Sequence, residues 1–158
     1  MWMNELFNTV FETELRLLIL LEVEDSIGSY EVMHQTTAEK LAAIDFIALY
    51  SASFGITESN LHGNGGYKFS EFAVRRDLTQ KALRELVRKG FVNAINSTSG
   101  FAYIITDAGR AFCAELADEY ADEYRMIVKL VMDETDTLSE RDLASFINRH
   151  SVNSLKRS

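Results

Sequence analysis

The sequence contains no proline, only one cysteine and only three histidines among its 158 residues. Because proline interrupts helices, its absence favours long helices without breaks. The lone cysteine, Cys113, excludes an intramolecular disulfide and favours a reducing, cytoplasmic setting. His34, His62 and His150 are far apart and match no metal-ligand spacing, so neither a metal site nor a cofactor is predicted.

The sequence also lacks an uninterrupted apolar segment long enough to span a bilayer. The most apolar stretch, residues 15–23, is interrupted by Arg16 and Glu22, and it is shorter than the roughly 20 residues that a transmembrane helix needs. It has neither a basic segment before it nor a small-residue cleavage site after it, as a signal peptide would. We therefore expect a buried helix here and no membrane partner.

The overall composition is that of a globular protein, with 47% hydrophobic and 25% charged residues. A chain of this length buries roughly two thirds of the surface that it exposes when unfolded. We predict a single winged-helix-like domain over residues 1–152 and a flexible tail over residues 153–158. The expected fold class is mainly α with a small β-hairpin and long flanking helices.

Apolar residues at helical spacing predict four helices besides the basic helix described next. Thr36 and Glu39 have the spacing of a capping box, and Gly55 is placed to end the helix that they begin. Thr106 is placed to cap a single long helix, which at 1.5 Å per residue would be roughly 40 Å long. The four helices are expected over residues 5–24, 36–54, 107–132 and 139–150.

The most informative segment runs from residue 69 to residue 106. A basic amphipathic helix over residues 69–89 is stopped by Gly90. Two strand-like runs, 91–96 and 101–106, flank a turn and form a hairpin over about 91–106. A helix, a glycine stop and a hairpin in this order are typical of a winged-helix domain.

The charge is unevenly distributed along the chain, whose net charge is -8. Residues 68–89 contain seven lysines and arginines against three acids, whereas residues 107–142 contain eleven acids against four bases. This asymmetry suggests two faces with different partners. The acidic total argues against a free-standing, non-specific DNA-binding protein, because neutralisation of phosphates dominates nucleic-acid affinity.

The basic residues of the predicted helix fall on two sides of it. Lys81, Arg84 and Arg88 lie together opposite the apolar residues, and Lys89 follows at the helix end. We predict that these four residues contact DNA or a partner, in the geometry of a recognition helix laid along phosphates. A solvated surface face is the equally weighted alternative, and Glu85 beside the stripe would repel phosphate.

Arg75 and Arg76 point toward the apolar side of the same helix. Burying an unpaired charge is costly, so either the helix begins after this pair or the pair meets carboxylates from a partner or from another helix of the chain. The connection over residues 55–68 is also longer than the 3–4 residues of the turn in a helix-turn-helix motif. Both features depart from an ordinary winged-helix repressor.

No set of residues in the sequence builds a convincing active site, and we predict that the chain is not an enzyme. Cys113 follows Phe112 on an apolar helix stripe, where a small core residue is expected more often than a nucleophile. The glycine-rich run 62–66 lacks the Gly-Lys-Ser/Thr ending of a phosphate-binding loop.

Taken in order and spacing, several short motifs resemble the middle component of three-component ABC-ATPase systems, which include the small accessory subunit of Lamassu-type bacterial defence. The resemblance covers roughly residues 7–150. Gly63 departs from it, since a proline is expected after Leu61-His62. The matching motifs are Phe7-Asn8, Leu15-Arg16, Asp45-Phe46, Leu61-His62, Val74-Arg75-Arg76, Gly90-Phe91-Val92 and Thr106.

The resemblance implies a non-catalytic subunit that joins a coiled-coil ATPase, similar to structural-maintenance-of-chromosomes (SMC) proteins, to an effector that is often a nuclease. Such a complex responds to phage or plasmid DNA, and this subunit would touch DNA only within the complex. Arg75, Arg76 and His62 are the matched residues expected at a partner interface. The alternative is a free-standing, dimeric MarR-like winged-helix transcriptional regulator that binds DNA alone.

Overall fold

The computed structural model describes residues 9–27, 36–61, 67, 69–98 and 100–151. Within them the chain is mainly helical with a small sheet, which confirms the predicted fold class. His62 and the tail predicted over residues 153–158 lie outside the described residues. The elements are α2 (Val10–Ile27), β1 (Thr36–Thr37), α3 (Ala38–Leu49), the 3-10 helix η1 (Ser51–Phe54), α4 (Phe69–Arg88), β2 (Val92–Ser97), β3 (Gly100–Ile105), α5 (Asp107–Glu115), α6 (Glu119–Thr135) and α7 (Glu140–Arg149).

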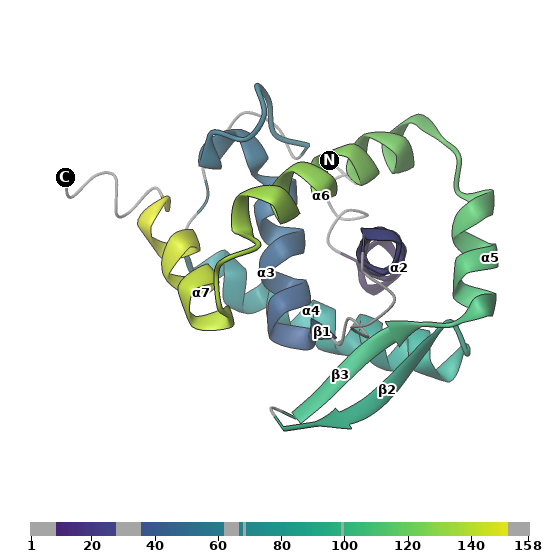
Figure 1. The fold of residues 1–158 in the computed structure, drawn as a ribbon. Helices are drawn as coiled ribbons and strands as arrows, with labels where there is room; N and C mark the ends of the chain where they lie inside the picture. The colour runs from purple at the N-terminus through teal and green to yellow at the C-terminus, as the bar shows by residue number, and fades with distance from the viewer. Residues whose placement is uncertain (1–8, 28–35, 62–66, 68, 99, 152–158) are drawn as a thin grey trace.

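Helix α2 occupies the centre of the molecule. Figure 1 looks along its axis and shows α3, α4, α5 and α6 arranged around it, and all four contact it. Leucines cover several sides of this helix, and a helix that is apolar all round is buried. Leu17, Leu18, Leu20 and Leu21 are at most 3% exposed, so the buried helix predicted from the apolar run is confirmed. None of the helices that the structure describes combines the length and apolar character of a membrane span.

Helix α3 is shorter than predicted and begins at a different cap. Thr37, rather than Thr36, is the N-cap, and its hydroxyl accepts the backbone N–H of Lys40 at 3.3 Å. The α-helix ends at Leu49 and gives way to η1. Gly55 then stops η1 with a φ of 74°, a left-handed conformation that glycine adopts without a steric penalty.

Helix α4 follows the prediction closely. It ends at Arg88, and Gly90 has a φ of 82° just after it. Ala82, Leu83 and Leu86 are buried, and the helix packs against α2 and α3. Val87 is 37% exposed although it is apolar, so the buried side of the helix does not include all of its apolar residues.

The hairpin forms as predicted, with β2 antiparallel to β3 and Val92 opposite Ile105. The short strand β1 adds a third, unpredicted strand, so that the sheet has the order β1–β3–β2. Two residues are too few to show the alternation by which a strand is recognised in a sequence. The order of helix, strand, two helices and hairpin is consistent with the winged-helix-like domain predicted above.

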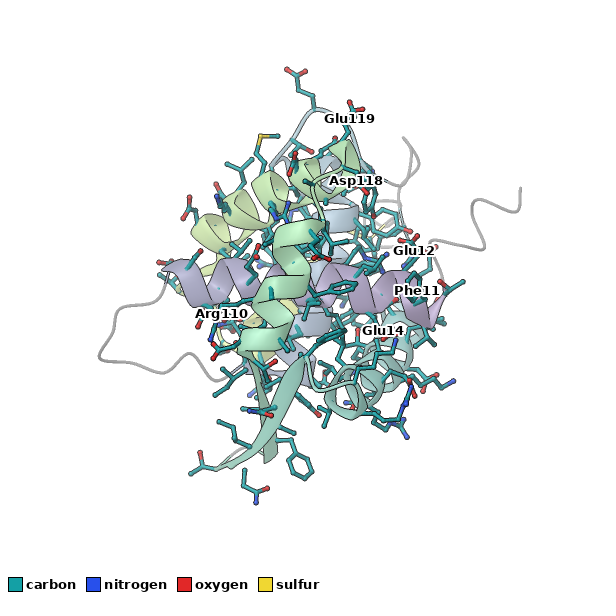
Figure 2. All side chains as sticks on the ribbon, turned by 90° about the vertical axis from the view of Figure 1, so that its right-hand side faces the viewer. Phe11, Glu12, Glu14, Arg110, Asp118 and Glu119 are labelled. Carbon is teal, nitrogen blue, oxygen red and sulfur yellow. The ribbon has the colours of Figure 1, made fainter. Side chains whose placement is uncertain are left out.

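The single long helix predicted over residues 107–132 is wrong, because the chain forms two helices there. Helix α5 ends at Glu115, and the C-cap residue Leu116 has a ψ of 85°, outside the helical range. Asp118 then starts α6 by accepting the backbone N–H of Ala121 with its side chain at 2.7 Å. An aspartate that caps a new helix competes with continuation of the old one. The break lets α5 cross over α2, as Figure 2 shows.

Helix α7 begins where the sequence indicates. Ser139 caps it by accepting the backbone N–H of Asp142 at 3.2 Å. An aromatic cluster holds α7 against η1, since the rings of Phe54 and Phe146 stack at 5.1 Å. The buried Tyr67 hydroxyl donates to the carbonyl of Ile147 at 2.6 Å.

Candidate interaction surface

The outer side of α4 carries the predicted basic stripe. Lys81, Arg84 and Arg88 are all exposed, because the helix turns its small and apolar residues toward α2 and α3. Two of the three have a carboxylate partner on the same helix. Lys81 Nζ lies 3.1 Å from Asp77 Oδ2, and Arg88 Nη2 lies 2.7 Å from Glu85 Oε2. Their positive charge is therefore partly neutralised before any ligand arrives.

The contact between Arg88 and Glu85 shifts the pKa of both groups. The hydrogen bond from Arg88 lowers the pKa of Glu85, and the same bond raises the pKa of Arg88. Each partner thus holds the other in its charged form. Glu85 was expected to repel phosphate. Because it also binds Arg88, a phosphate would have to displace it from that arginine.

Lys89, at the end of α4, is turned toward the N-terminal part of α2. Its Nζ lies 2.7 Å from Glu14 Oε1, whose side chain is 7% exposed, and 5.7 Å from the ring centroid of Phe11. Figure 2 labels Phe11 and Glu14 on this part of α2. Lys89 therefore joins α4 to α2, and a DNA strand along α4 would have to compete with Glu14 for it.

Arg84 differs from its three neighbours. Its Nε donates to the carbonyl of Gln80 at 3.4 Å, and no carboxylate lies within ion-pair distance of it in the part of the chain that the structure describes. The nearby positive charge of Arg84 opposes the rise that burial causes in the pKa of Tyr103. Arg84 is therefore the cation of the stripe that is best placed to meet an acidic group of a partner.

A groove of about 220 Å³ separates α4 from the hairpin and has Arg84 on its edge. Phe101 is 60% exposed, which is unusual for a large aromatic side chain. We call this groove, including Arg84, the α4 groove. Its lining residues are Leu83, Arg84, Val87, Ala94, Phe101 and Tyr103.

The predicted interface pair Arg75-Arg76 is divided between the interior and the surface. Arg76 Nη1 lies 3.4 Å from Glu39 Oε2, and its guanidinium lies 5.3 Å from the ring centroid of Phe72. Helix α4 begins at Phe69, before the pair, and of the remaining alternatives an ion pair within the chain is observed for Arg76.

Arg75 is 7% exposed, so a partner would reach little of its side chain. It lies in the polar surroundings of Tyr50, whose hydroxyl donates to Glu71 Oε2 at 3.0 Å. Burial and this hydrogen bond raise the pKa of Tyr50, and the charge of Arg75 opposes the rise. The third residue of the predicted interface, His62, lies outside the described residues.

A buried charged network, which sequence reasoning did not predict, links three helices. Arg16 on α2 is 0% exposed, and its Nε donates to Asp45 Oδ1 of α3 at 2.9 Å. The hydroxyl of Tyr124 on α6 donates to the same oxygen at 2.6 Å. The signal was present in the sequence, since Arg16 and Asp45 each interrupt an apolar run.

The two partners control the charge state of this network. Burial by itself would lower the pKa of Arg16, but the adjacent Asp45 carboxylate more than offsets it, and the net shift is upward. Burial, followed by the charge of Asp45, raises the pKa of Tyr124 well above its usual value. Arg16 is therefore charged and Tyr124 neutral at any physiological pH.

A family model for the Middle Component 2 of ABC-three component (ABC-3C) systems matches residues 6–157. The chain belongs to this family. No match was found among curated proteins or among solved structures.

Membership of the Middle Component 2 family agrees with the predicted middle component of an ABC-ATPase system. The match includes both residues of the buried pair, Arg16 and Asp45, and the whole α4 groove. A middle component is one part of a multicomponent system, so other proteins are expected to contact its surface.

Cys113 of this Middle Component 2 chain lies where a core residue is expected. Its side chain is completely buried, and burial raises the pKa of its thiol to about 12. A nucleophilic cysteine is accessible and has a lowered pKa. Cys113 has neither property, in agreement with its interpretation as a packing residue.

The outer side of α6 has the opposite charge to α4. Glu119, Glu123 and Asp133 are exposed on it, and Figure 2 shows Glu119 pointing away from the body of the molecule. Met126 is 58% and Leu130 is 40% exposed. This acidic side with two exposed apolar side chains provides a second surface of different chemistry.

Proposed function

We propose that this chain is a non-catalytic accessory subunit of a defence complex and bridges an SMC-like coiled-coil ATPase and an effector nuclease. In this role it helps to couple the sensing of foreign DNA, from phages or plasmids, to activation of the effector. The observation that carries the proposal is the match of residues 6–157 to a middle component. The surface chemistry described above supports the finer assignment.

The α4 groove supplies the first partner surface. An exposed aromatic side chain beside an arginine is typical of the residues that dominate binding energy at protein interfaces. Arg84 has its guanidinium available for a carboxylate, and Phe101 offers apolar area to bury. We assign this groove to one of the two large partners.

The acidic side of α6 supplies the second surface. Met126 and Leu130 offer apolar contact area there, and the surrounding carboxylates favour a basic partner. Two surfaces of opposite charge allow one small subunit to hold two different proteins at once, which is what bridging requires.

Direct DNA contact is proposed only within the assembled complex. Lys81, Arg88 and Lys89 each have a carboxylate partner in the chain itself. Affinity for DNA depends on cations that can neutralise phosphates, so the stripe alone is a weak phosphate-binding surface. The same observation counts against the MarR-like regulator.

Co-expression of the tagged chain with an SMC-like ATPase and an effector nuclease tests the proposal. We expect a stable ternary complex by size-exclusion chromatography with light scattering. Phe101→Asp should release one of the two large proteins. The matched control is Phe11→Asp, since Phe11 is exposed to nearly the same fraction, 58% against 60%, but lies outside the α4 groove.

Two outcomes would count against the proposal. If the unmodified chain forms no stable association with an SMC-like ATPase, the bridging role is refuted. If the purified chain alone shifts a single operator sequence at physiological salt with nanomolar affinity, the MarR-like regulator is the better description.

A further inference from the structure

The hairpin leaves one edge of the sheet open. The strand order β1–β3–β2 makes β2 an outer strand, and no described residue pairs with its far side. Figure 2 shows the hairpin extending away from the helices at the lower edge of the view. The outer strand of a sheet presents unpaired backbone N–H and C=O groups, to which a strand of another chain can bind.

The register shows which backbone groups of β2 point outward. Ser97 lies opposite Gly100 across a two-residue turn, so these two residues exchange the backbone hydrogen bonds that close the hairpin. Hydrogen-bonded and non-hydrogen-bonded pairs alternate along an antiparallel ladder. The N–H and C=O groups of Ile95 therefore point toward β3, and those of Ala94 and Asn96 point outward. Both Ala94 and Asn96 are exposed.

No feature of β2 protects this edge from pairing. Edge strands that stay unpaired in native proteins are usually protected by a charged side chain, a proline, a bulge or a very short length. The six residues of β2, Val-Asn-Ala-Ile-Asn-Ser, include neither a charge nor a proline, and their register with β3 runs without a bulge. By contrast, β1 at the other edge of the sheet has only two residues. The composition of β2 is thus that of an edge that another strand covers.

The α4 groove lies on one face of the sheet beside this edge. Ala94, Phe101 and Tyr103 line it together, because Ala94 lies opposite Tyr103 and every second residue of a strand points to the same face. A segment paired with β2 would place every second side chain on that face as well. The side chain of Ala94 is small, so a large apolar side chain beside it can reach the exposed ring of Phe101.

The charge beside the groove favours an acidic segment. Arg84 is the one charged residue among the described residues that line it, and none of the described carboxylates lies within ion-pair distance of Arg84. In an extended segment, a carboxylate two residues from the apolar side chain lies on the same face and can pair with Arg84. A basic segment would be repelled by the same arginine.

We propose that β2 receives a fourth strand from a partner protein, an extended segment in which apolar and acidic side chains alternate on the face that covers the α4 groove. Its backbone bonds to Ala94 and Asn96, one apolar side chain enters the groove, and a carboxylate pairs with Arg84. In such complexes the main-chain hydrogen bonds give affinity and the side-chain pockets give specificity. That the segment belongs to one of the two bridged proteins rests on the proposed function, whereas the strand-binding edge does not.

Amide hydrogen exchange of the full, ¹⁵N-labelled chain tests the edge directly. In the free chain the amide of Ile95 should be protected, and those of Ala94 and Asn96 should exchange rapidly. The probe is acetyl-Glu-Thr-Leu-Thr-Glu-Thr-Leu-Thr-amide, in which glutamate and leucine share one face of the extended peptide. At saturation it should slow exchange at residues 94 and 96 at least about tenfold, with a dissociation constant on the order of millimolar for a short flexible peptide.

Two control peptides separate the backbone from the side chains. The same peptide, N-methylated at one leucine and at the threonine after it, keeps its side chains but has no intact backbone edge, so it should not slow exchange. The peptide with lysine in place of glutamate should bind at least about tenfold more weakly, because it meets Arg84 with a like charge.

Variants of the chain test the same contacts from the other side. Ala94→Pro removes one outward N–H, a change that edge strands tolerate, and should abolish binding of the glutamate peptide. The matched control is Ala94→Ser, which keeps the N–H and nearly the same size and should bind like the parent. Arg84→Glu should reverse the preference between the glutamate and lysine peptides, and it remains informative if Ala94→Pro does not fold.

The edge is refuted if the glutamate peptide does not slow exchange at residues 94 and 96, or if the N-methylated peptide binds equally well. A preference of the parent chain for the lysine peptide would refute the acidic segment. Protection of both amides that appears together with a dimer in light scattering would assign the edge to a second copy of the chain and overturn the assignment to a partner protein. All of these measurements use the isolated chain, so a failure to co-purify with an ATPase would refute the proposed function without touching the strand-binding edge.

Discussion

Arg16 Nε donates to Asp45 Oδ1 at 2.9 Å, and the two side chains are 0% and 3% exposed. They lie 29 residues apart and join the central helix α2 to α3 inside the hydrophobic core. A buried ion pair costs much to desolvate, so its net contribution to stability is small, whereas loss of one partner leaves an uncompensated buried charge. The pair therefore fixes how α2 and α3 meet more than it adds to stability.

The first prediction concerns this pair. Asp45→Asn should lower the free energy of unfolding by about 3–5 kcal/mol, because Arg16 would then be buried without its counter-charge. Urea unfolding followed by circular dichroism measures the change. The double variant Arg16→Met with Asp45→Leu should lower the free energy of unfolding by less than the sum of the changes caused by its two single variants. Arg110→Ala, at an exposed ion pair with Asp25, is the control and should change stability by less than about 1 kcal/mol.

Gly109 gives the second prediction. A Cβ on this residue would lie 2.3 Å from the carbonyl oxygen of Phe91 and 2.8 Å from Cγ1 of Ile105. Glycine inside a helix is ordinarily less favourable than alanine by about 0.8–1 kcal/mol. Here the clash with backbone reverses that preference, and Gly109→Ala should destabilise the chain by about 1–3 kcal/mol. A variant as stable as the parent, by the same urea experiment, would show that α5 does not approach Phe91 and Ile105 so closely.

The sequence predicted the elements that depend on local patterns. The apolar run around Leu17 predicted a buried helix because it is mostly leucine and too short to span a bilayer, and Gly90 predicted the end of α4 because it adopts a positive φ there. The helix predicted over residues 139–150 and the hairpin were likewise recognisable. Each of these features is decided by a few neighbouring residues, so a sequence displays them directly.

Features that depend on competing or distant contacts were not predictable in the same way. The break between α5 and α6 depends on Asp118, whose side chain fits either the surface of one helix or the cap of another. The ion pair of Lys89 with Glu14 joins residues 75 positions apart. Sequence reasoning placed three cations on one stripe and Lys89 at its end, but it could not show that Lys81, Arg88 and Lys89 have carboxylate partners within the chain.

Cys113 gives a prediction about alkaline pH. Its pKa in the folded state is about 12, against 9.0 for the unperturbed group. Above pH 9 the unfolded chain loses the thiol proton while the folded chain keeps it, so the contribution is fully present below pH 9 and declines as pH rises toward 12. The decline amounts to at most about 1.4 kcal/mol per pH unit.

Comparison with Cys113→Ala isolates this effect, because the buried tyrosines titrate in both chains. We expect the difference in unfolding free energy between parent and variant to shrink steadily from pH 9 to pH 11. In addition, a thiol reagent at pH 8 should label Cys113 only after urea is added. Rapid labelling of the native chain would contradict the buried environment.

The last prediction distinguishes the cations of the α4 stripe from one another. Arg84 has no carboxylate partner among the described residues and borders the α4 groove, whereas Arg88 already pairs with Glu85. An arginine that already pairs with a carboxylate of its own chain contributes less to the binding of a partner than an arginine that does not. Arg84→Glu should therefore weaken binding of the partner that occupies the groove by at least about tenfold, and Arg88→Glu should weaken it less.

Binding of labelled chain to the purified partner at several salt concentrations measures both effects. The dissociation constant should depend less on salt concentration for Arg84→Glu than for Arg88→Glu. Charges at the edge of an interface act mainly through long-range attraction, which salt screens. Arg141→Glu, a change of an exposed arginine on α7, is the control for net charge and should behave like the parent. Equal effects of all three variants would mean that the overall charge governs the association. The prediction that Arg84 contacts the partner in the α4 groove would then be refuted.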